Sequence, residues 1–444
     1  MKIIQKFLFL ISLFSVISAQ PTSTVKHPEW VKDAVIYEVN LRQYTPGGTI
    51  SEFKEHLPRL KELGVDILWF MPIHPIGEVN RKGTMGSYYA VKDYTGLGAE
   101  YGTKEEFKGL VNEIHKQGMY VILDWVANHT AWDHPWTSSN SEFYIKNDRG
   151  DFVPPVPDWH DVIKLDYSNS NLRTEMIKAF EYWVNDFNVD GFRCDVAGMV
   201  PLDFWVDARN QLAKSKEIFW LAEWDTPEMQ KDAFNMTYGG ENYRIGTRIF
   251  KGENTAFDLF KSIGREQTEF HPEAIIMQFT TNHDENTWNG ATHETIRGAE
   301  EVFTALTYLI PGMPLIYSGQ EAGLDKRLSF FDKDEIIWKQ APMADFFKKL
   351  NSLKKSNSAL NIGEVGAKLV TELSEDQSTL FIIRKRGEKQ VVGIFNLSAK
   401  QSNNSFNHKE LQGTYTDFTS GNKEVFQKKI NSSLPPWGYK ILSK

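Results

Sequence analysis

Strand-length apolar runs recur eight times between residues 34 and 317, separated by stretches in which apolar residues have helical spacing. The runs cover residues 34–39, 65–71, 120–123, 189–192, 218–222, 234–238, 275–279 and 314–317. This alternation predicts parallel β/α units, because a helix that crosses over the sheet is the usual connection between parallel strands. Eight units predict an α/β fold, a closed (β/α)8 TIM barrel, and 444 residues are enough for that barrel and a smaller domain. A capping-box pattern from Thr103 to Glu106 predicts the start of one connecting helix.

Two regions depart from this alternation within and after the predicted barrel, which covers residues 26–357. Residues 130–163, after the third run, are too many for a loop and one helix, and they are rich in Trp, Pro, Asp and Asn. They predict a short inserted domain. Over residues 358–444 the pattern changes to alternating strands without helices, as at 390–395 and 437–442, which predicts a C-terminal β-sandwich domain.

The first 19 residues have the three parts of an export signal: the cations Lys2 and Lys6, an apolar run over 7–17, and the small residues Ser18 and Ala19. This pattern predicts cleavage after Ala19. The run is too short to span a bilayer comfortably, and no second apolar stretch of about 18 residues follows it. A buried N-terminal helix is the alternative, but the pattern favours export to the periplasm or the medium without a membrane anchor.

The composition excludes some partners. A formal net charge of −8 disfavours nucleic acid and anionic membranes and agrees with a neutral ligand. The 13 Trp residues suit flat apolar ligands as well as a core. Cys194 is the only cysteine, which excludes an intramolecular disulfide and a cysteine-based zinc cluster, and we expect it to be a buried small apolar side chain. The oligomeric state stays open.

Three acidic residues, Asp195, Glu223 and Asp284, each follow a predicted strand. Acidic side chains at the carboxyl ends of barrel strands point into one shared mouth. Asp195 and Glu223 are about one strand–helix–strand repeat apart, so we expect them on adjacent strands. Cleavage of a glycosidic bond requires such a pair, one group to protonate the departing oxygen and one to stabilise or trap the sugar cation.

Several segments around these residues match a known family. They are 64–72, 124–129 (DWVANH), 191–195 (GFRCD), 219–223 (FWLAE), 281–284 (TNHD) and 312–321. In this order they resemble the α-amylase family of glycoside hydrolases, over roughly residues 33–321. The resemblance implies that Asp195 is the nucleophile, that Glu223 is the general acid and then base, and that Asp284 binds sugar hydroxyls and steadies the transition state.

The resemblance also implies substrate contacts. His129 and His283 match the two family histidines that hydrogen-bond the sugar at the cleavage point, and Tyr89 matches the tyrosine that stacks on it. The adjacent Tyr88 is the alternative for that ring.

The residues themselves suggest how the carboxyl groups differ. Arg193 lies two positions before Asp195 and therefore projects from the same face of the strand, so we expect it to hold Asp195 ionised. Glu223 follows a run of apolar residues, and an apolar setting raises a carboxyl pKa toward that of a proton donor. Asp124 is expected to organise the site by bonding Arg193 or nearby backbone more than to touch sugar.

Many family members hold a calcium ion at the inserted domain, and the resemblance identifies Asn128 and the carbonyl of Met199 as two of its ligands here. Lys164 stands where the ligand carboxylate would be, and a cation cannot ligate a cation. We therefore expect no cofactor. One hypothesis places the Lys164 ammonium in the position of the metal, paired with nearby acceptors, as in the neopullulanase and maltogenic amylase branch. A solvated Lys164 is the alternative, and other calcium sites in the insertion stay open.

The predicted activity is retaining hydrolysis of α-1,4-glucosidic bonds in starch-like α-glucans or malto-oligosaccharides. One alternative is a transglycosylase, or an enzyme degrading cyclodextrin or pullulan, that uses the same site. A non-catalytic glucan-binding relative is a third possibility, and the presence of all three acidic residues argues against it.

Overall fold

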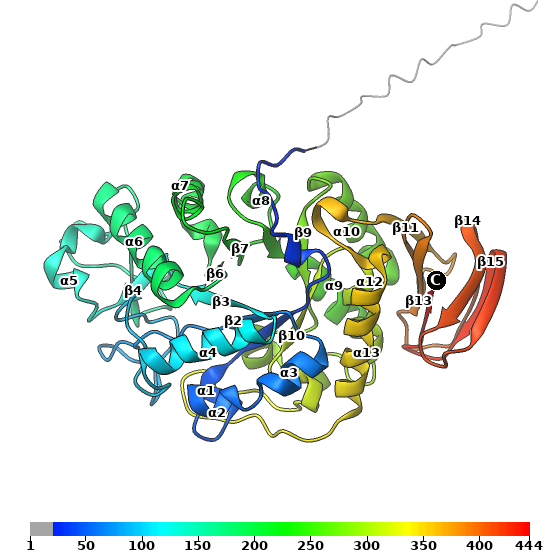
Figure 1. Cartoon of the computed structure of the whole chain (residues 1–444), viewed down its shortest axis with the longest axis horizontal. Helices are drawn as coiled ribbons and strands as arrows, with labels where there is room; N and C mark the ends of the chain where they lie inside the picture. The colour runs from blue at the N-terminus through cyan, green and yellow to red at the C-terminus, as the bar shows by residue number, and fades with distance from the viewer. Residues whose placement is uncertain (1–20) are drawn as a thin grey trace, which may run out of the picture.

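The computed structural model describes residues 21–444, so the predicted signal at 1–19 lies outside the described residues. Eight parallel strands close a barrel in the order β1-β10-β9-β8-β7-β6-β3-β2 (Figure 1). They are β1 (Ile36–Val39), β2 (Ile67–Phe70), β3 (Tyr120–Trp125), β6 (Gly191–Cys194), β7 (Phe219–Ala222), β8 (Met236–Tyr238), β9 (Ile275–Gln278) and β10 (Met313–Tyr317). Each coincides with one predicted run, and the predicted (β/α)8 barrel is confirmed.

The helices that connect these strands surround the barrel. The longer ones are α2 (Ile50–Lys54), α3 (Leu57–Leu63), α4 (Lys104–Lys116), α6 (Ser170–Phe187), α7 (Leu202–Leu212), α9 (Gly240–Phe250), α10 (Ala256–Glu269), α12 (Glu300–Leu309) and α13 (Pro342–Ser356). Single turns form α1 (Leu41–Tyr44), α5 (Trp136–Ser139), α8 (Met229–Asp232) and α11 (Thr292–Thr295). Other short turns are Glu29–Val31, Ser141–Phe143, Ala197–Met199, Gln320–Ala322, Ser358–Leu360 and Gly363–Val365, and Glu285–Asn289 is a π-helical turn. The predicted capping box is present at α4, where Thr103 Oγ1 accepts from Glu106 N at 3.1 Å.

Two apolar layers hold the barrel together. Residues on the inner faces of the strands, such as Ile67, Leu221 and Met277, fill its interior, while residues on the outer faces pack against the helices. At the amino-terminal end of the strands, Trp30 stacks on Tyr120 with ring centroids 4.0 Å apart. Side chains alternate between the two layers along each strand. Polar residues that continue the inward-facing positions therefore point into the mouth at the carboxyl end of the barrel.

The segment between β3 and α6 contains a small antiparallel ribbon of β4 (His129–Ala131) and β5 (Val162–Lys164). The loop after β2 packs against this ribbon through a cluster of Ile76, Ala90, Ala131 and Val162. The ribbon and this loop therefore form one wall above the barrel.

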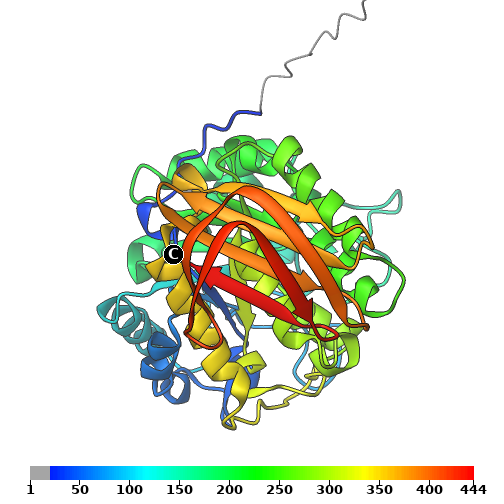
Figure 2. The same cartoon turned by 90° about the vertical axis from the view of Figure 1, so that its right-hand side faces the viewer.

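The C-terminal strands form an antiparallel sheet in the order β11-β12-β13-β16-β14-β15 (Figure 2). They are β11 (Lys368–Leu373), β12 (Thr379–Arg386), β13 (Lys389–Asn396), β14 (Ser402–Asp417), β15 (Lys423–Leu434) and β16 (Tyr439–Ser443). The long β14–β15 hairpin joins the sheet only through Thr416 and Asp417 on β16, and it folds over β12, where Phe406 stacks on Phe381 with centroids 4.7 Å apart. The two layers thus belong to one continuous sheet. Within residues 21–444, no helix has the length and apolarity needed to cross a membrane.

Candidate active site

Arg193, near the carboxyl end of β6, is the centre of the polar site. Its guanidinium is fully buried and contacts three carboxylates. Nη1 donates to Asp124 Oδ1 at 2.8 Å and to Asp195 Oδ1 at 3.0 Å, and Nη2 lies 2.8 Å from Glu223 Oε1. The adjacent strands β6 and β7 therefore bring Asp195 and Glu223 to one guanidinium, as the spacing of the two residues predicts.

Glu223 has a second anchor in the backbone. The N–H of Val196 donates to Glu223 Oε2 at 2.6 Å. Val196 has φ +38° and ψ +47°, a left-handed conformation that a β-branched residue rarely adopts. Such strain is found where the surrounding structure imposes it, often at functional sites. Here it points the peptide N–H that follows Asp195 at the second carboxyl group.

The electrostatics of the carboxyl groups differ from the sequence prediction. Burial, with the Glu223 carboxylate beside it, raises the pKa of Asp195 well above its ordinary value despite the pairing with Arg193. The expected ion pair between Arg193 and Asp195 is present, but the expectation that it keeps Asp195 ionised is wrong, because one guanidinium is divided among three carboxylates. Burial likewise raises the pKa of Asp124 to about 6.

The predicted apolar setting of Glu223 is also wrong. Trp220, which suggested it, belongs to the outer layer of the barrel, since alternate residues of β7 face opposite sides. The Glu223 side chain instead keeps polar partners and is 22% exposed. Cys194 faces the same outer layer and is buried, as expected.

Asp284 and His283 form a second polar group across the mouth. Asp284 Oδ1 accepts from Trp288 Nε1 at 3.2 Å, and Oδ2 lies 3.3 Å from His283 Nε2. Burial opposes ionisation of Asp284, but the charge of His283 prevails and lowers the pKa of Asp284 to about 2. His283 Nδ1 bonds Glu38 Oε1 on β1 at 2.5 Å, and Nε2 bonds the Tyr89 hydroxyl at 2.7 Å. Asp284 is therefore held as an anion.

The structure distinguishes the two candidate tyrosines by their hydrogen-bond partners. The Tyr89 hydroxyl donates to Asp124 Oδ2 at 3.1 Å, and its ring lies parallel to that of His283. Tyr88 points elsewhere, since its hydroxyl donates to Asn40 and the Arg42 guanidinium covers its ring. Tyr89 is thus the tyrosine at the site.

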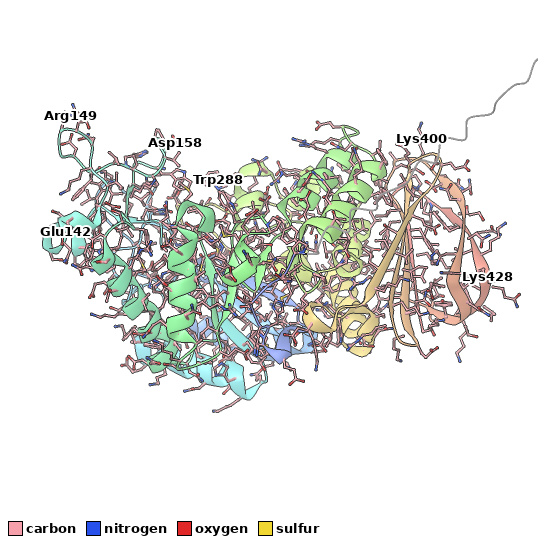
Figure 3. All side chains as sticks on the ribbon, turned by 90° about the horizontal axis from the view of Figure 1, so that it is seen from above. Glu142, Arg149, Asp158, Trp288, Lys400 and Lys428 are labelled. Atoms are coloured by element: carbon pink, nitrogen blue, oxygen red, sulfur yellow. The ribbon has the colours of Figure 1, made fainter. Side chains whose placement is uncertain are left out.

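A cavity of about 540 Å³ opens above these groups. It is lined by Lys82, Ser87, Tyr89, His129, Asp158, Trp159, His160, Asp161, Val162, Asp195, Val196, Glu223, Asp284, Trp288, Phe330 and Phe331. Seen from above, Asp158 and Trp288 lie near one another, away from the C-terminal sheet that carries Lys400 and Lys428 (Figure 3). Arg193, Asp124 and His283 lie directly behind the lining. Burial lowers the pKa of His129 to about 3, so this lining histidine is neutral.

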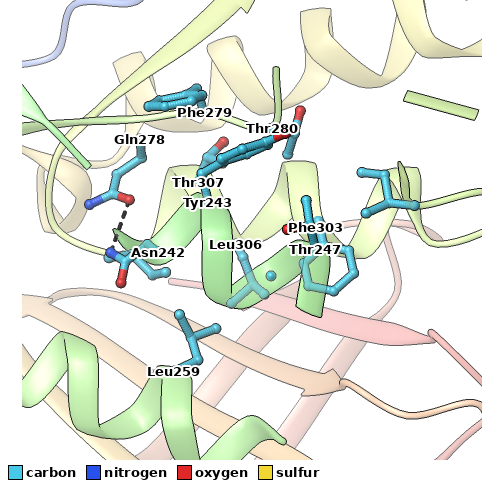
Figure 4. A pocket seen from close by; sticks show the side chains of 13 residues that line it. Asn242, Tyr243, Thr247, Leu259, Gln278, Phe279, Thr280, Phe303, Leu306 and Thr307 are labelled. Carbon is cyan, nitrogen blue, oxygen red and sulfur yellow. Dashed lines mark hydrogen bonds between the residues drawn. The ribbon is translucent and has the colours of Figure 1, made fainter. Parts of the chain in front are cut away.

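Within residues 21–444, two further hollows contain none of the predicted site residues. One, between α9, α10 and α12, is small and largely apolar, and Asn242 donates to Gln278 beside it at 3.2 Å (Figure 4). A wider surface groove runs between α3 and the start of α13. The cavity above Asp195 and Glu223 is therefore the candidate active site.

Sequence reasoning missed several residues of this site. Glu38 could have been found from the sequence, because it is the one charged residue of an apolar strand and lies between Tyr37 and Val39. Trp69 Nε1, which donates to Asp124 Oδ2 at 3.1 Å, carried no such signal. Nor did the Tyr238 hydroxyl, which accepts from Arg193 Nε at 3.1 Å.

The family's calcium site does not fit this chain. Lys164 lies on β5 opposite His129, and among residues 21–444 the structure pairs no acceptor with its ammonium, so the predicted ion pairing is absent. Over the same residues, no group of three or more His, Cys, Asp or Glu side chains is arranged to hold a metal ion. A lysine in this position is incompatible with an oxygen-ligand set for calcium.

A closed (β/α)8 barrel with paired carboxyl groups at the ends of adjacent strands, open to a cavity, defines a barrel glycoside hydrolase. The model of the α-amylase catalytic domain matches residues 28–360. The chain therefore belongs to the α-amylase family.

Individual relatives agree with this assignment. The chain is 27% identical over 351 residues to α-amylase MalA of Haloarcula japonica, a match that covers 75% of this chain and only 50% of that enzyme. It is similar to the structure of the noncanonic maltogenic α-amylase AmyB from Thermotoga neapolitana, with a TM-score of 0.85, 28% identity, and coverage of 93% of this chain and 99% of that one. The α-amylase from Lactobacillus plantarum gives a TM-score of 0.82 with 31% identity over the same shares of the two chains.

Proposed function

We propose that this protein hydrolyses α-1,4-glucosidic bonds of starch-like glucans or malto-oligosaccharides with retention of configuration. The observation that carries the proposal is the placement of Asp195 and Glu223 on neighbouring nitrogens of one buried guanidinium, with both groups lining the cavity. In retaining enzymes, two carboxyl groups that flank the glycosidic bond act as nucleophile and acid/base.

The proposed reaction has two steps. An Asp195 carboxylate oxygen bonds to the anomeric carbon while the bond to the departing sugar oxygen breaks, and Glu223 gives that oxygen its proton. Glu223 then removes a proton from water, the water oxygen bonds to the same carbon, and Asp195 leaves. Asp284, held anionic by His283, stabilises the positive charge that develops on the sugar.

This chemistry requires one proton shared between Asp195 and Glu223. Their mutual repulsion and the burial that raises the pKa of Asp195 disfavour two anions, while Arg193 disfavours two neutral acids. We infer that substrate binding directs the single proton to Glu223, which has the more exposed side chain.

Product analysis tests the proposal. The purified protein should release maltose or short oligosaccharides from amylose and maltotriose, with the new reducing end initially in the α-anomeric form by NMR. Asp195→Asn should lower kcat by about 10³-fold or more. A matched control is Asp190→Asn, which alters a carboxylate on the opposite end of β6 and should keep activity. Equal release by wild type and Asp195→Asn would refute the assignment.

The same assay separates the alternatives. Longer products at high substrate concentration would indicate transfer to a sugar acceptor, whereas their absence indicates hydrolysis. Parallel incubations with cyclodextrin and pullulan test those substrate classes. Binding of amylose without any product would support the non-catalytic relative.

We also propose that the chain is exported, on the basis of the signal pattern before Gln20. Expression of the full chain in a bacterium with a general secretion system should give a mature protein that begins at Gln20. Amino-terminal sequencing checks this, and a cytoplasmic protein that retains the whole apolar run 7–17 would contradict it.

A further inference from the structure

Three segments that are distant in sequence meet on one side of the active-site cavity. The loop after β2 lines the cavity with Lys82, and the inserted segment lines it with residues from Asp158 to Val162, the first residue of β5. The loop after β10 lines it with Phe330 and Phe331. Their mutual contacts decide whether a long chain can pass through the cavity on that side.

Lys82 joins the first two segments. Its ammonium lies 3.1 Å from Asp161 Oδ1 and donates to the carbonyl of Asp158 at 3.0 Å. The Asp161 side chain is 6% exposed and that of Lys82 is 21% exposed, so this ion pair is better protected from solvent than a typical surface pair. The same ammonium lies 5.8 Å from the centroid of the Phe331 ring, which brings the third segment to the same point.

The loop that carries Lys82 is also bound to the third segment directly. Thr84 donates to Asp332 Oδ1 through both its N–H, at 2.8 Å, and its hydroxyl, at 2.6 Å. Met85 N donates to the carbonyl of Phe331 at 2.9 Å. Gly83 has φ +62°, and a Cβ there would lie 2.5 Å from the Phe331 Cβ, so only glycine permits this approach.

We propose that the Lys82–Asp161 ion pair closes one end of the active-site cavity, so that a glucan chain enters only by a terminus. This rests on the proposed function. A cavity of about 540 Å³ is within the roughly 300–1,000 Å³ of sites that bind one small ligand, which gives room for a few sugar rings. The ion pair determines specificity by exclusion, since any group attached to the sugar at the closed end must displace it.

Maltoheptaose and two blocked derivatives provide the test. One derivative carries a cyclic acetal on its non-reducing glucose, and the other is reduced to the alditol at the opposite end. The wild-type protein should cleave one of the two derivatives about tenfold or more slowly than free maltoheptaose, in kcat/KM. Lys82→Ala and Asp161→Asn should each bring that ratio close to one, and Lys82→Arg should preserve discrimination because it keeps the ion pair.

Lys92 offers a matched control. Its ammonium bridges Asp133 at 3.0 Å and Glu78 at 3.2 Å, so it joins the same loop to the same inserted segment, but it does not line the cavity. Lys92→Ala should therefore retain the wild-type preference. Thermal melts of all variants establish that each is folded.

Two results would overturn the proposal: equal cleavage of all three substrates by the wild-type protein, or unchanged discrimination in both Lys82→Ala and Asp161→Asn. Absence of activity toward free maltoheptaose is a different outcome, because it refutes the hydrolase assignment. Calorimetric titration of the same three oligosaccharides then tests the inference. One blocked form should bind more weakly than free maltoheptaose to the wild-type protein, and the two should bind equally to Lys82→Ala.

Discussion

At the scale of single residues, Arg193 organises the site. Three carboxyl groups from three strand ends converge on its buried guanidinium, and Tyr238 accepts from Nε. A planar group with separate nitrogens can meet several acceptors at once, whereas a lysine ammonium is a single point of charge. The positions of Asp195 and Glu223 relative to each other therefore depend on this one residue.

Arg193→Lys should lower kcat by about 10²-fold or more, because it removes a fixed donor from one of the two carboxyl groups to which we assign catalysis. The sign of the pH effect also follows. Weaker pairing with a cation disfavours the carboxylate form of Asp195 and raises its pKa, so the acidic limb of the kcat/KM profile should move to higher pH. An unchanged limb would show that Arg193 does not control the protonation of the pair.

Trp288 provides a finer test of Asp284. Trp288→Phe keeps an aromatic ring beside Phe330 but removes the N–H that donates to Asp284 Oδ1. We expect kcat to fall about tenfold or more, as for loss of one hydrogen bond to a charged group, with little change in KM. Steady-state kinetics on maltotriose measure it, and a change confined to KM would indicate that Trp288 acts only as a surface for sugar.

At the scale of elements, the end of α13 contains a buried basic residue. Lys354 is completely buried where this helix meets the C-terminal sheet, and Nζ donates to the carbonyl of Leu360 at 3.0 Å. Burial, with the charge of Arg384 nearby, lowers the pKa of Lys354 to about 7. The contact between barrel and sheet therefore contains a cation that costs stability whenever it is protonated.

Lys354→Met should stabilise the protein by about 1–3 kcal/mol near pH 6, because it replaces a buried charge with an apolar chain of similar length. A folded pKa below the unfolded value of about 10.5 means that wild-type stability rises with pH between about 7 and 10.5, so the advantage of the variant should shrink over that range. Urea unfolding of both proteins at several pH values measures the difference. Lys355→Met, which breaks a partly exposed pair with Asp66, is the control and should change stability by less than about 1 kcal/mol.

At the scale of the whole molecule, the barrel, the inserted ribbon and the C-terminal sheet are joined by apolar packing and hydrogen bonds. Arg384, from β12, donates to the carbonyls of Leu309 and Asn361 at 3.1 and 3.2 Å and so links the sheet to the barrel. The ribbon rests on the loop after β2.

We expect chelation to leave the melting temperature unchanged within about 1 °C, because the resemblance to the α-amylase family places Lys164 where a calcium-binding carboxylate would stand. Differential scanning calorimetry with EDTA, and again after addition of calcium, is the measurement. A large fall in melting temperature that calcium reverses would contradict the prediction and indicate a metal site elsewhere in the insertion.

The sequence was sufficient for the architecture of the barrel and for the acidic residues of its mouth. All eight strands coincide with apolar runs, and Asp195, Glu223 and Asp284 line one cavity. The sequence was insufficient to predict the pKa values of the carboxyl groups at the site. The pKa of Asp195 depends on burial and on two other carboxylates that share Arg193, and no local pattern encodes either.

Periodicity, capping and the identity of residues at strand ends are properties of a few neighbouring positions, so the chain alone determined the strands, the α4 capping box and which acids face the mouth. Partners far apart along the chain were decided only by folding. Glu38 meets His283, and Lys82 meets Asp161, because closure of the barrel and docking of the insertion bring distant strands and loops within hydrogen-bond distance. Burial arises at the same stage, and with it the pKa values and the shape of the cavity.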